Sequence, residues 1–92
     1  MKLHFKRRAL GHIEQIHDYI AKENPAVAKR VIERIEDAIG RLSILPMSGR
    51  QGVVKGTRLL AVPGVPYIVV HRVGADVVEI LAVLHTARQR RN

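Results

Sequence analysis

Four cationic side chains in the carboxyl-terminal half are the residues best suited to chemistry or to binding an anion. They are Arg58, Arg72, His85 and Arg88. Arginine contacts phosphate or carboxylate oxygens through paired N–H groups, and histidine changes its charge near neutral pH. Two activities are therefore open. The arginines could clamp a phosphate while a histidine transfers a proton, or the cations could form a surface that binds a polyanion or an acidic protein.

Each of these side chains also has a structural alternative. His71 lies in a β-branched run, and we favour a structural role for it, with the ring bonded to a backbone group or to an Arg neighbour. For His85 the structural and chemical roles are equally open. Arg58 fits a functional role slightly better, whereas Arg72 is more naturally the partner of a carboxylate such as Glu79.

Several kinds of chemistry are excluded or disfavoured. The chain has no Cys, so it forms neither a disulfide nor a thiolate metal site. His12 and His17 are five residues apart on an expected helix and diverge, so we expect no metal and no cofactor. The glycine-rich segment 49–56 follows a helix and precedes a strand, which is the reverse of a phosphate-binding loop. With one Phe, two Tyr and no Trp, the chain lacks an aromatic platform for single-stranded nucleic acid.

Length and composition indicate one small domain, spanning residues 1–92. Apolar residues make up 47% of the 92, which is enough to form a core. No apolar run approaches the roughly 20 residues that cross a bilayer, and the amino end lacks the apolar segment of a signal peptide. We therefore expect a cytoplasmic protein without a membrane association.

The charge is strongly positive, with 16 Lys and Arg against 8 Asp and Glu, a formal net charge of +8. In residues 47–92 the acidic residues are Asp76 and Glu79 alone. The electrostatic field of this positive charge attracts polyanions and acidic proteins. Residues 86–92 are expected to be a flexible basic tail, because they lack an apolar anchor.

The elements that must position these cations follow from hydrophobic periodicity. Residues 2–5 alternate as a strand, and an apolar stripe at helical spacing begins at Ala9 and ends at Ile20. Asn24 and Pro25 are typical of the cap and first position of a second helix. We expect that helix to end at Leu45, because the residue before a proline avoids helical geometry.

The rest of the chain predicts a loop over 46–57 and three strands within 56–62, 67–73 and 77–88. The fold class is therefore α+β, in the order β-α-α-β-β-β, with a helical hairpin packed on one face of a small antiparallel sheet. The other face is left for solvent or a partner. On the last strand, strict alternation predicts that Glu79, Leu81, Val83 and His85 share one face.

The chain resembles the ParE/RelE toxin superfamily of type II toxin–antitoxin systems over nearly its whole length. The resemblance depends on short segments taken together, in their order and spacing, rather than on one motif. They are residues 16–20 (IHDYI), 24–28 (NPAVA), 45–50 (LPMSGR), 56–58 (GTR), 66–69 (PYIV), 72–73 (RV) and 83–88 (VLHTAR).

The superfamily implies two functions. RelE-like members cut messenger RNA in the ribosome, whereas ParE-like members poison DNA gyrase, and both are neutralised by an antitoxin. RelE-like nucleases tend to have further cationic and aromatic residues, where this chain has Leu60, Ile68 and no aromatic residue near its end. The resemblance therefore places the chain closer to the ParE branch.

The resemblance implies a toxin that inhibits gyrase by binding, with Arg58, Arg72, His85 and Arg88 as contacts, in a heterodimer or heterotetramer with a ParD-like antitoxin. The first alternative is a RelE-like ribonuclease that uses His85, Arg58 and Arg88. The second is a module that has lost toxicity and only binds an antitoxin.

Overall fold

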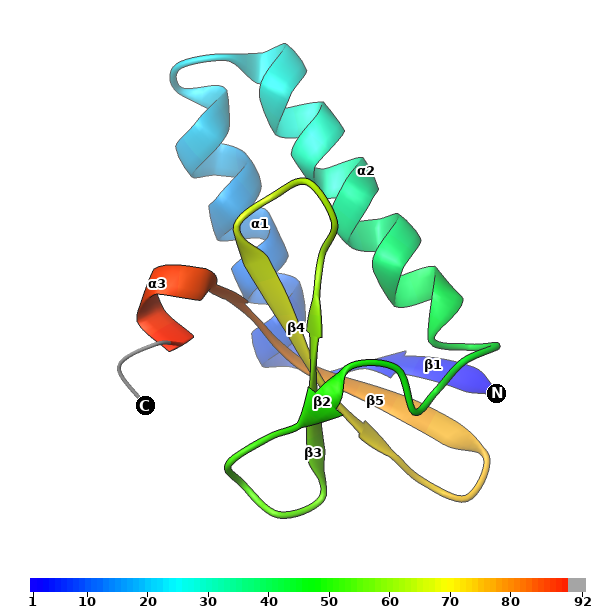
Figure 1. Cartoon of the computed structure of the whole chain (residues 1–92). Helices are drawn as coiled ribbons and strands as arrows, with labels where there is room; N and C mark the ends of the chain where they lie inside the picture. The colour runs from blue at the N-terminus through cyan, green and yellow to red at the C-terminus, as the bar shows by residue number, and fades with distance from the viewer. Residues whose placement is uncertain (90–92) are drawn as a thin grey trace.

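The computed structural model describes the backbone of residues 1–89 and the side chains of residues 1–87. It has three helices and five strands within that range. They are β1 (Lys2–Phe5), α1 (Arg7–Ala21), α2 (Pro25–Arg41), β2 (Arg50–Gln51), β3 (Thr57–Ala61), β4 (Tyr67–Val73), β5 (Val77–His85) and α3 (Thr86–Gln89). The expected α+β fold, a helical hairpin on one face of a sheet, is confirmed (Figure 1).

The second helix begins where its sequence signals place it. The side chain of Asn24 accepts a 3.1 Å hydrogen bond from the backbone N–H of Val27, and Pro25 occupies the first helical position. This satisfies one of the N–H groups that a helix start leaves without a partner. The short connection between α1 and α2 holds the two helices side by side (Figure 1).

The expected end of this helix at Leu45 is wrong, because α2 ends at Arg41. The N–H groups of Leu42 and Ser43 bond back only three residues, to Ile39 and Gly40, and tighten the last turn. The Ser43 hydroxyl also donates to the Gly40 carbonyl. Glycine is a weak helix former and serine competes for backbone groups, so the helix unwinds before Pro46.

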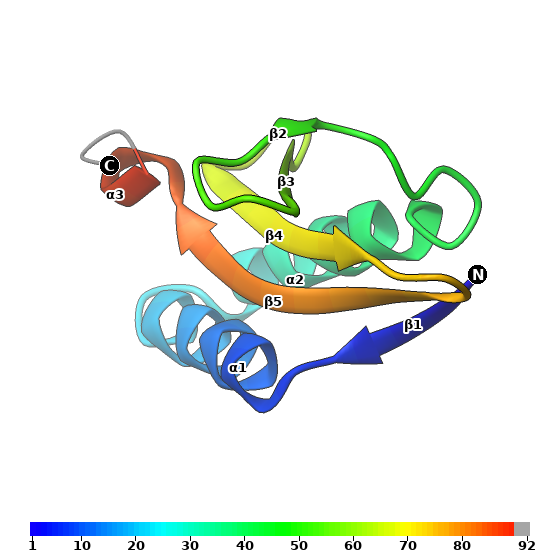
Figure 2. The same ribbon diagram turned by 90° about the horizontal axis from the view of Figure 1, so that it is seen from below.

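The sheet has the order β1-β5-β4-β3-β2 (Figure 2). Strands β3 to β5 pair antiparallel, as expected, and the additional strand β2 pairs antiparallel with β3. The expectation of a wholly antiparallel sheet is wrong for β1, which pairs parallel with β5. The connection explains this, because parallel neighbours need a long crossover and the chain between β1 and β5 includes both helices. The two-residue strand β2 lies within the expected loop over 46–57 and forms the second edge.

A bulge on β5 changes which side chains face the helices. Val70 pairs with Ala82 and His71 with Ile80, so Leu81 is an extra residue on β5. Val83 therefore enters the core beneath the helices, whereas Glu79 lies opposite Arg72 on the other face. The expectation that Glu79, Leu81 and Val83 share one face is wrong for this reason.

The core lies between the helical hairpin and the sheet. Its fully buried side chains come from both layers and include Ile35, Ile39, Leu42, Val69, Val78 and Ile80. None of the helices in residues 1–89 combines the length and hydrophobicity that a bilayer crossing requires. Of the expected flexible tail over 86–92, residues 86–89 form the helical turn α3, and residues 90–92 lie outside the described range.

Candidate functional site

Arg58 and His71 form a polar pair inside the sheet. They are cross-strand partners on β3 and β4, on the face that carries Leu60 and Val69 toward the helices. The Arg58 guanidinium donates a 2.9 Å hydrogen bond from Nη2 to the Gly49 carbonyl oxygen. His71 Nε2 lies 3.0 Å from the carbonyl oxygen of Pro46. The hydrogen bonds of these two side chains therefore attach residues 46–49 to the sheet.

His71 is fully buried, and its environment keeps it neutral. Burial lowers its pKa because an imidazolium loses its hydration, and the nearby positive charge of Arg58 lowers it further, against the opposing effect of the hydrogen bond to Pro46. A neutral ring that donates from Nε2 to a carbonyl has a structural role. The expected bond of the His71 ring to a backbone group is present.

Arg72 projects from the opposite face of β4. Its Nη1 lies 4.0 Å from Glu79 Oε1, and Lys6 Nζ approaches the same carboxylate more closely, at 3.2 Å from Oε2. The expected ion pair of Arg72 with Glu79 is present. It leaves about half of the Arg72 side chain exposed, at 52%, and exposed pairs of this kind contribute little to stability.

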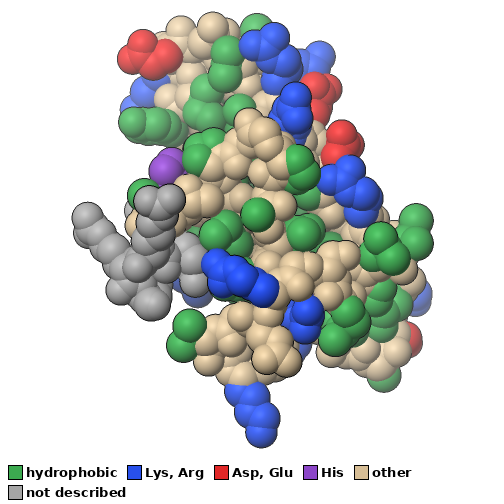
Figure 3. All heavy atoms as spheres, in the orientation of Figure 1, with side chains coloured by type: hydrophobic (Ala, Val, Ile, Leu, Met, Phe, Trp, Pro, Cys, Tyr) green, Lys and Arg blue, Asp and Glu red, His purple; other side chains and the backbone are tan. Residues whose placement is uncertain are grey.

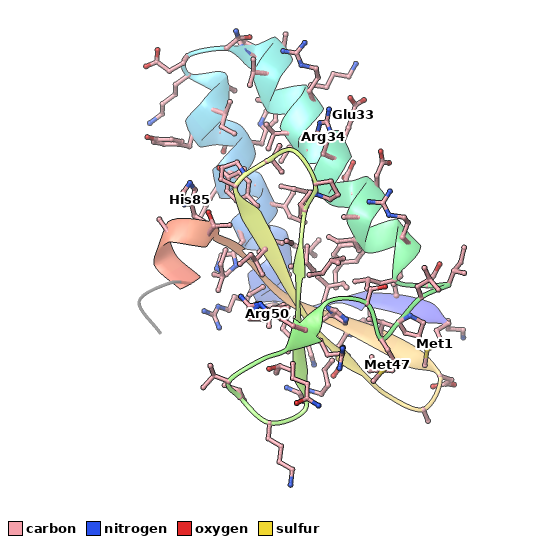
Figure 4. All side chains as sticks on the ribbon, viewed as in Figure 1. Met1, Glu33, Arg34, Met47, Arg50 and His85 are labelled. Atoms are coloured by element: carbon pink, nitrogen blue, oxygen red, sulfur yellow. The ribbon has the colours of Figure 1, made fainter. Side chains whose placement is uncertain are left out.

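His85 ends β5 beside α1 (Figure 4). Its ring meets Tyr67, its cross-strand partner, edge to face with centroids 5.4 Å apart. The ring Nδ1 accepts a 3.1 Å hydrogen bond from the Ala87 N–H, so Nε2 carries the proton in the neutral ring. His85, Tyr67 and Tyr19 line an open cleft of about 390 Å³ between α1 and the ends of β4 and β5.

The structure does not bring the expected cations together. Arg58 and Arg72 lie on opposite faces of the sheet, because Arg72 pairs with Thr57, the neighbour of Arg58. His85 pairs with Tyr67, four residues along β4 from His71, the partner of Arg58. Four residues of strand span roughly 13 Å. The side chain of Arg88 lies outside the described residues.

His12 has a position that its sequence spacing did not indicate. This polar residue of α1 is half-buried, and its Nδ1 accepts a 3.2 Å hydrogen bond from the Val83 N–H on β5. β1 pairs with β5 only as far as Ile80, so beyond that point no strand within residues 1–89 neighbours β5 on this side. No sequence signal marks this bond, since it joins residues 71 apart.

The sheet face opposite the helices carries an apolar groove, the outer groove. The floor of this groove consists of Leu59, Val70, Ala82 and Leu84. The first three are paired in one row across β3, β4 and β5. Its wall is Val53 and Val54, in the loop between β2 and β3. Arg8 and Arg72 also line it. The groove has a volume of about 370 Å³.

A second exposed apolar patch, the corner patch, lies where α2 leads into the 46–49 segment. It consists of Ile44, Leu45 and Met47. Met1 lies at the same corner of the molecule as Met47 (Figure 4), and its ammonium group donates a 2.8 Å hydrogen bond to the Ser43 carbonyl.

Among the described residues, no three His, Cys, Asp or Glu side chains are placed to hold a metal ion. Lys and Arg side chains are spread over the face in Figure 3, with fewer acidic ones. A helical hairpin on one face of a small mixed sheet, with a cationic surface, defines the class of fold to which the described residues belong.

Comparison with known proteins identifies the family. Residues 3–90 match the family model described as ParE toxin of the type II toxin–antitoxin system parDE, and the chain belongs to this family.

Two relatives agree with this assignment. The chain is 41% identical over 88 residues to the protein named "Putative toxin Y4kP" of Sinorhizobium fredii, covering 96% of this chain and 91% of that one. It is 33% identical over 81 residues to Toxin RelE2 of Caulobacter vibrioides, covering 88% and 90%. A solved structure, titled as the chromosomal ParDE TA system from P. aeruginosa, superposes with a TM-score of 0.82 at 25% identity, covering 92% of this chain and 95% of that one.

Proposed function

We propose that this ParE-family toxin inhibits DNA gyrase by binding it in the cytoplasm, and that a ParD-like antitoxin neutralises it in a heterodimer or heterotetramer. The observation that carries the proposal is the dispersal of the cations. Arg58 and Arg72 face opposite sides of the sheet, and His85 is at the far end of β4 and β5 from both. A docking protein can use such dispersed contacts, whereas a phosphate-cleaving site cannot.

The geometry of Arg58 argues against a catalytic role for this residue. A ribonuclease must hold donors about 3 Å from the developing oxyanion and a proton-transfer group within hydrogen-bond reach of the same centre. Arg58 is instead partly buried and donates to the Gly49 carbonyl. His85 is separated from it by roughly 13 Å along β4 alone.

The proposed contacts with the target are Arg58, Arg72, His85 and Arg88. Of these, Arg72 and His85 have exposed side chains in the structure. Arg58 would contribute chiefly by holding the 46–49 segment in place.

A supercoiling assay with purified toxin and gyrase tests the proposal. We expect loss of supercoiling and accumulation of cleaved DNA held by gyrase. Replacing both Arg72 and His85 by Ala should weaken inhibition, whereas Arg30→Ala, an exposed arginine on α2, should not. Unchanged supercoiling with no cleavage complex would reject gyrase as the target.

The relationship to Toxin RelE2 supports a second candidate, a ribosome-dependent ribonuclease with His85 as the proton-transfer group. Incubating the toxin with translating ribosomes separates the two. Messenger RNA cleavage that His85→Ala abolishes, together with unaffected gyrase, would establish the ribonuclease. Normal growth of cells in which the chain is induced alone would instead indicate a non-toxic antitoxin-binding module.

A further inference from the structure

A row of cationic side chains begins on β1, the strand at one edge of the sheet (Figure 2). The side chains at even positions of β1 are exposed, whereas those at odd positions pack against the core, so the even ones point away from the helices. Lys6 follows, and its Nζ lies 3.2 Å from Glu79 Oε2 on that outer face. Arg8 and Arg72 both line the outer groove and continue the row. The row, the basic stripe, consists of Lys2, His4, Lys6, Arg8 and Arg72.

We propose that the basic stripe binds the phosphate backbone of duplex DNA without reading its sequence. This inference goes beyond the proposed function, because it assigns the toxin a DNA contact of its own. It rests on the proposed function only for the choice of DNA over RNA, since the proposed target enzyme acts on a DNA duplex. The toxin alone should therefore bind DNA, without gyrase.

Charge is segregated between the two layers of the fold. Six of the eight acidic residues of the chain lie within residues 14–37, in the helical hairpin on the opposite face of the sheet. Of the other two, Asp76 lies in the turn before β5, and Glu79 lies within the stripe. Lys6 and Arg72 both approach the Glu79 carboxylate. The four Lys and Arg side chains of the stripe exceed this one carboxylate by three charges, so the local field favours a polyanion.

The stability of α1 does not account for the cations at its start. The helix begins with Arg7 and Arg8, has no acidic residue in its first turn, and has no side-chain hydrogen bond at its N-cap. The start of a helix carries partial positive charge, which disfavours cations there. Within residues 1–87, the side chains of Lys2 and Arg8 have neither an ion pair nor a hydrogen bond. Both are exposed and available to an external anion.

The composition of the stripe favours a duplex over a single strand. Proteins that hold single strands stack the bases on aromatic side chains, and the stripe contains none. Contacts to the phosphates of a duplex need only exposed cations, and they carry no sequence information. The backbone from Lys2 to Lys6 spans about 13 Å. Over that length a duplex presents roughly eight phosphate charges, at one per about 1.7 Å of its axis.

Fluorescence anisotropy of a short labelled DNA duplex, titrated with the purified toxin, tests the inference. We expect log affinity to fall against log salt with a slope of about −3, at about −0.9 per phosphate neutralised. Lys2→Ala combined with Arg8→Ala should weaken binding at about 50 mM salt by about tenfold or more and reduce the slope by about 1.8. The matched control, Lys29→Ala with Arg30→Ala, removes the same charge from exposed positions of α2 and should leave the slope unchanged.

A second variant should strengthen binding, which a misfolded protein would not do. Glu79→Gln removes the negative charge within the stripe, so it should raise the affinity about tenfold and steepen the slope by about 0.9. Glu33→Gln makes the same change of charge at an exposed position of α2, and should leave the affinity unchanged. Thermal melting of every variant checks that it folds.

Equal weakening by the two double variants would overturn the inference, because the overall charge rather than the stripe would then be responsible. Tighter binding of an RNA duplex of the same sequence, or displacement of the DNA by polyglutamate at equal charge concentration, would overturn the choice of DNA. The supercoiling assay separates this inference from the proposed function. A toxin that inhibits gyrase without binding the duplex refutes the stripe alone, whereas DNA binding through the stripe without gyrase inhibition refutes the proposed target alone.

Discussion

Arg58 and His71 face each other across β3 and β4, and each has one buried nitrogen that bonds to no other described group. The atoms are Arg58 Nε, a donor, and His71 Nδ1, which is an acceptor in the neutral ring. The other ends of both side chains hold the 46–49 segment, through Gly49 and Pro46. The two residues thus form one structural unit, in which the uncharged histidine ring lies beside the positively charged arginine without charge repulsion.

Replacing His71 by Leu should destabilise the protein by about 2 kcal/mol. The apolar side chain removes the donor to the Pro46 carbonyl and leaves the buried end of Arg58 beside a hydrocarbon. His71→Gln keeps a donor and should cost less. Urea denaturation of the three proteins measures the difference, and equal midpoints for wild type and His71→Leu would contradict the structural role.

Acidification should destabilise the folded protein through His71. The pKa of His71 is lowered from its ordinary value of 6.5, first by burial and then by Arg58. As the pH falls below about 6.5, the unfolded chain takes up a proton that the folded protein resists. The free energy of unfolding then falls, by at most about 1.4 kcal/mol per pH unit for one group. Above that pH the contribution is complete and constant.

The comparison of wild type with His71→Gln isolates this effect from the other histidines. Unfolding midpoints at pH 7.5 and pH 5.0 should differ more in wild type than in the variant. Parallel pH dependence in the two proteins would show that His71 is not the group responsible.

Gly49→Ala should destabilise the protein by about 2 kcal/mol or more. Gly49 has φ of 88°, which side-chain-bearing residues rarely adopt. A Cβ there would also overlap the backbone carbonyl of Leu59. Gly11→Ala is the control, because a Cβ on this residue of α1 meets nothing within 4 Å. It should stabilise by about 0.5–1 kcal/mol, so thermal melting should show shifts of opposite sign.

His12→Leu should cost about 1–3 kcal/mol, because it leaves the Val83 N–H of β5 without the acceptor it has in the folded protein. His17→Leu, five residues along the same helix, alters an exposed side chain bonded only to Asp18 among the described contacts. It should be nearly neutral. Similar losses in both variants would mean that helix propensity, rather than the bond to β5, is responsible.

The fold was largely predictable because its signals are local. Helical spacing in residues 9–20, the Asn24 cap and the alternating strands each act over a few residues, and each gave the correct element. The end of α2 was mistaken because Gly40 and Ser43 weaken the helix before Pro46 stops it.

The candidate site was less predictable, because strand register and the Leu81 bulge decide which side chains meet. The residue types identified Arg58, Arg72 and His85 as candidates, and the family resemblance was confirmed by the match over residues 3–90. Only the pairing of β3, β4 and β5 could show that these cations diverge. A shift of one residue moves a side chain to the other face, and local sequence does not encode that shift.

The sequence by itself determined α1, the start of α2 and the strands β1, β3, β4 and β5, together with the excess of positive charge and the family, since these depend on residue type and short-range spacing. Tertiary structure decided that β1 lies parallel to β5, that His12 accepts a bond from Val83, and that Leu59, Val70 and Ala82 line one groove. Each of these joins segments distant along the chain. Contacts of that kind are set by packing and register once the elements have formed.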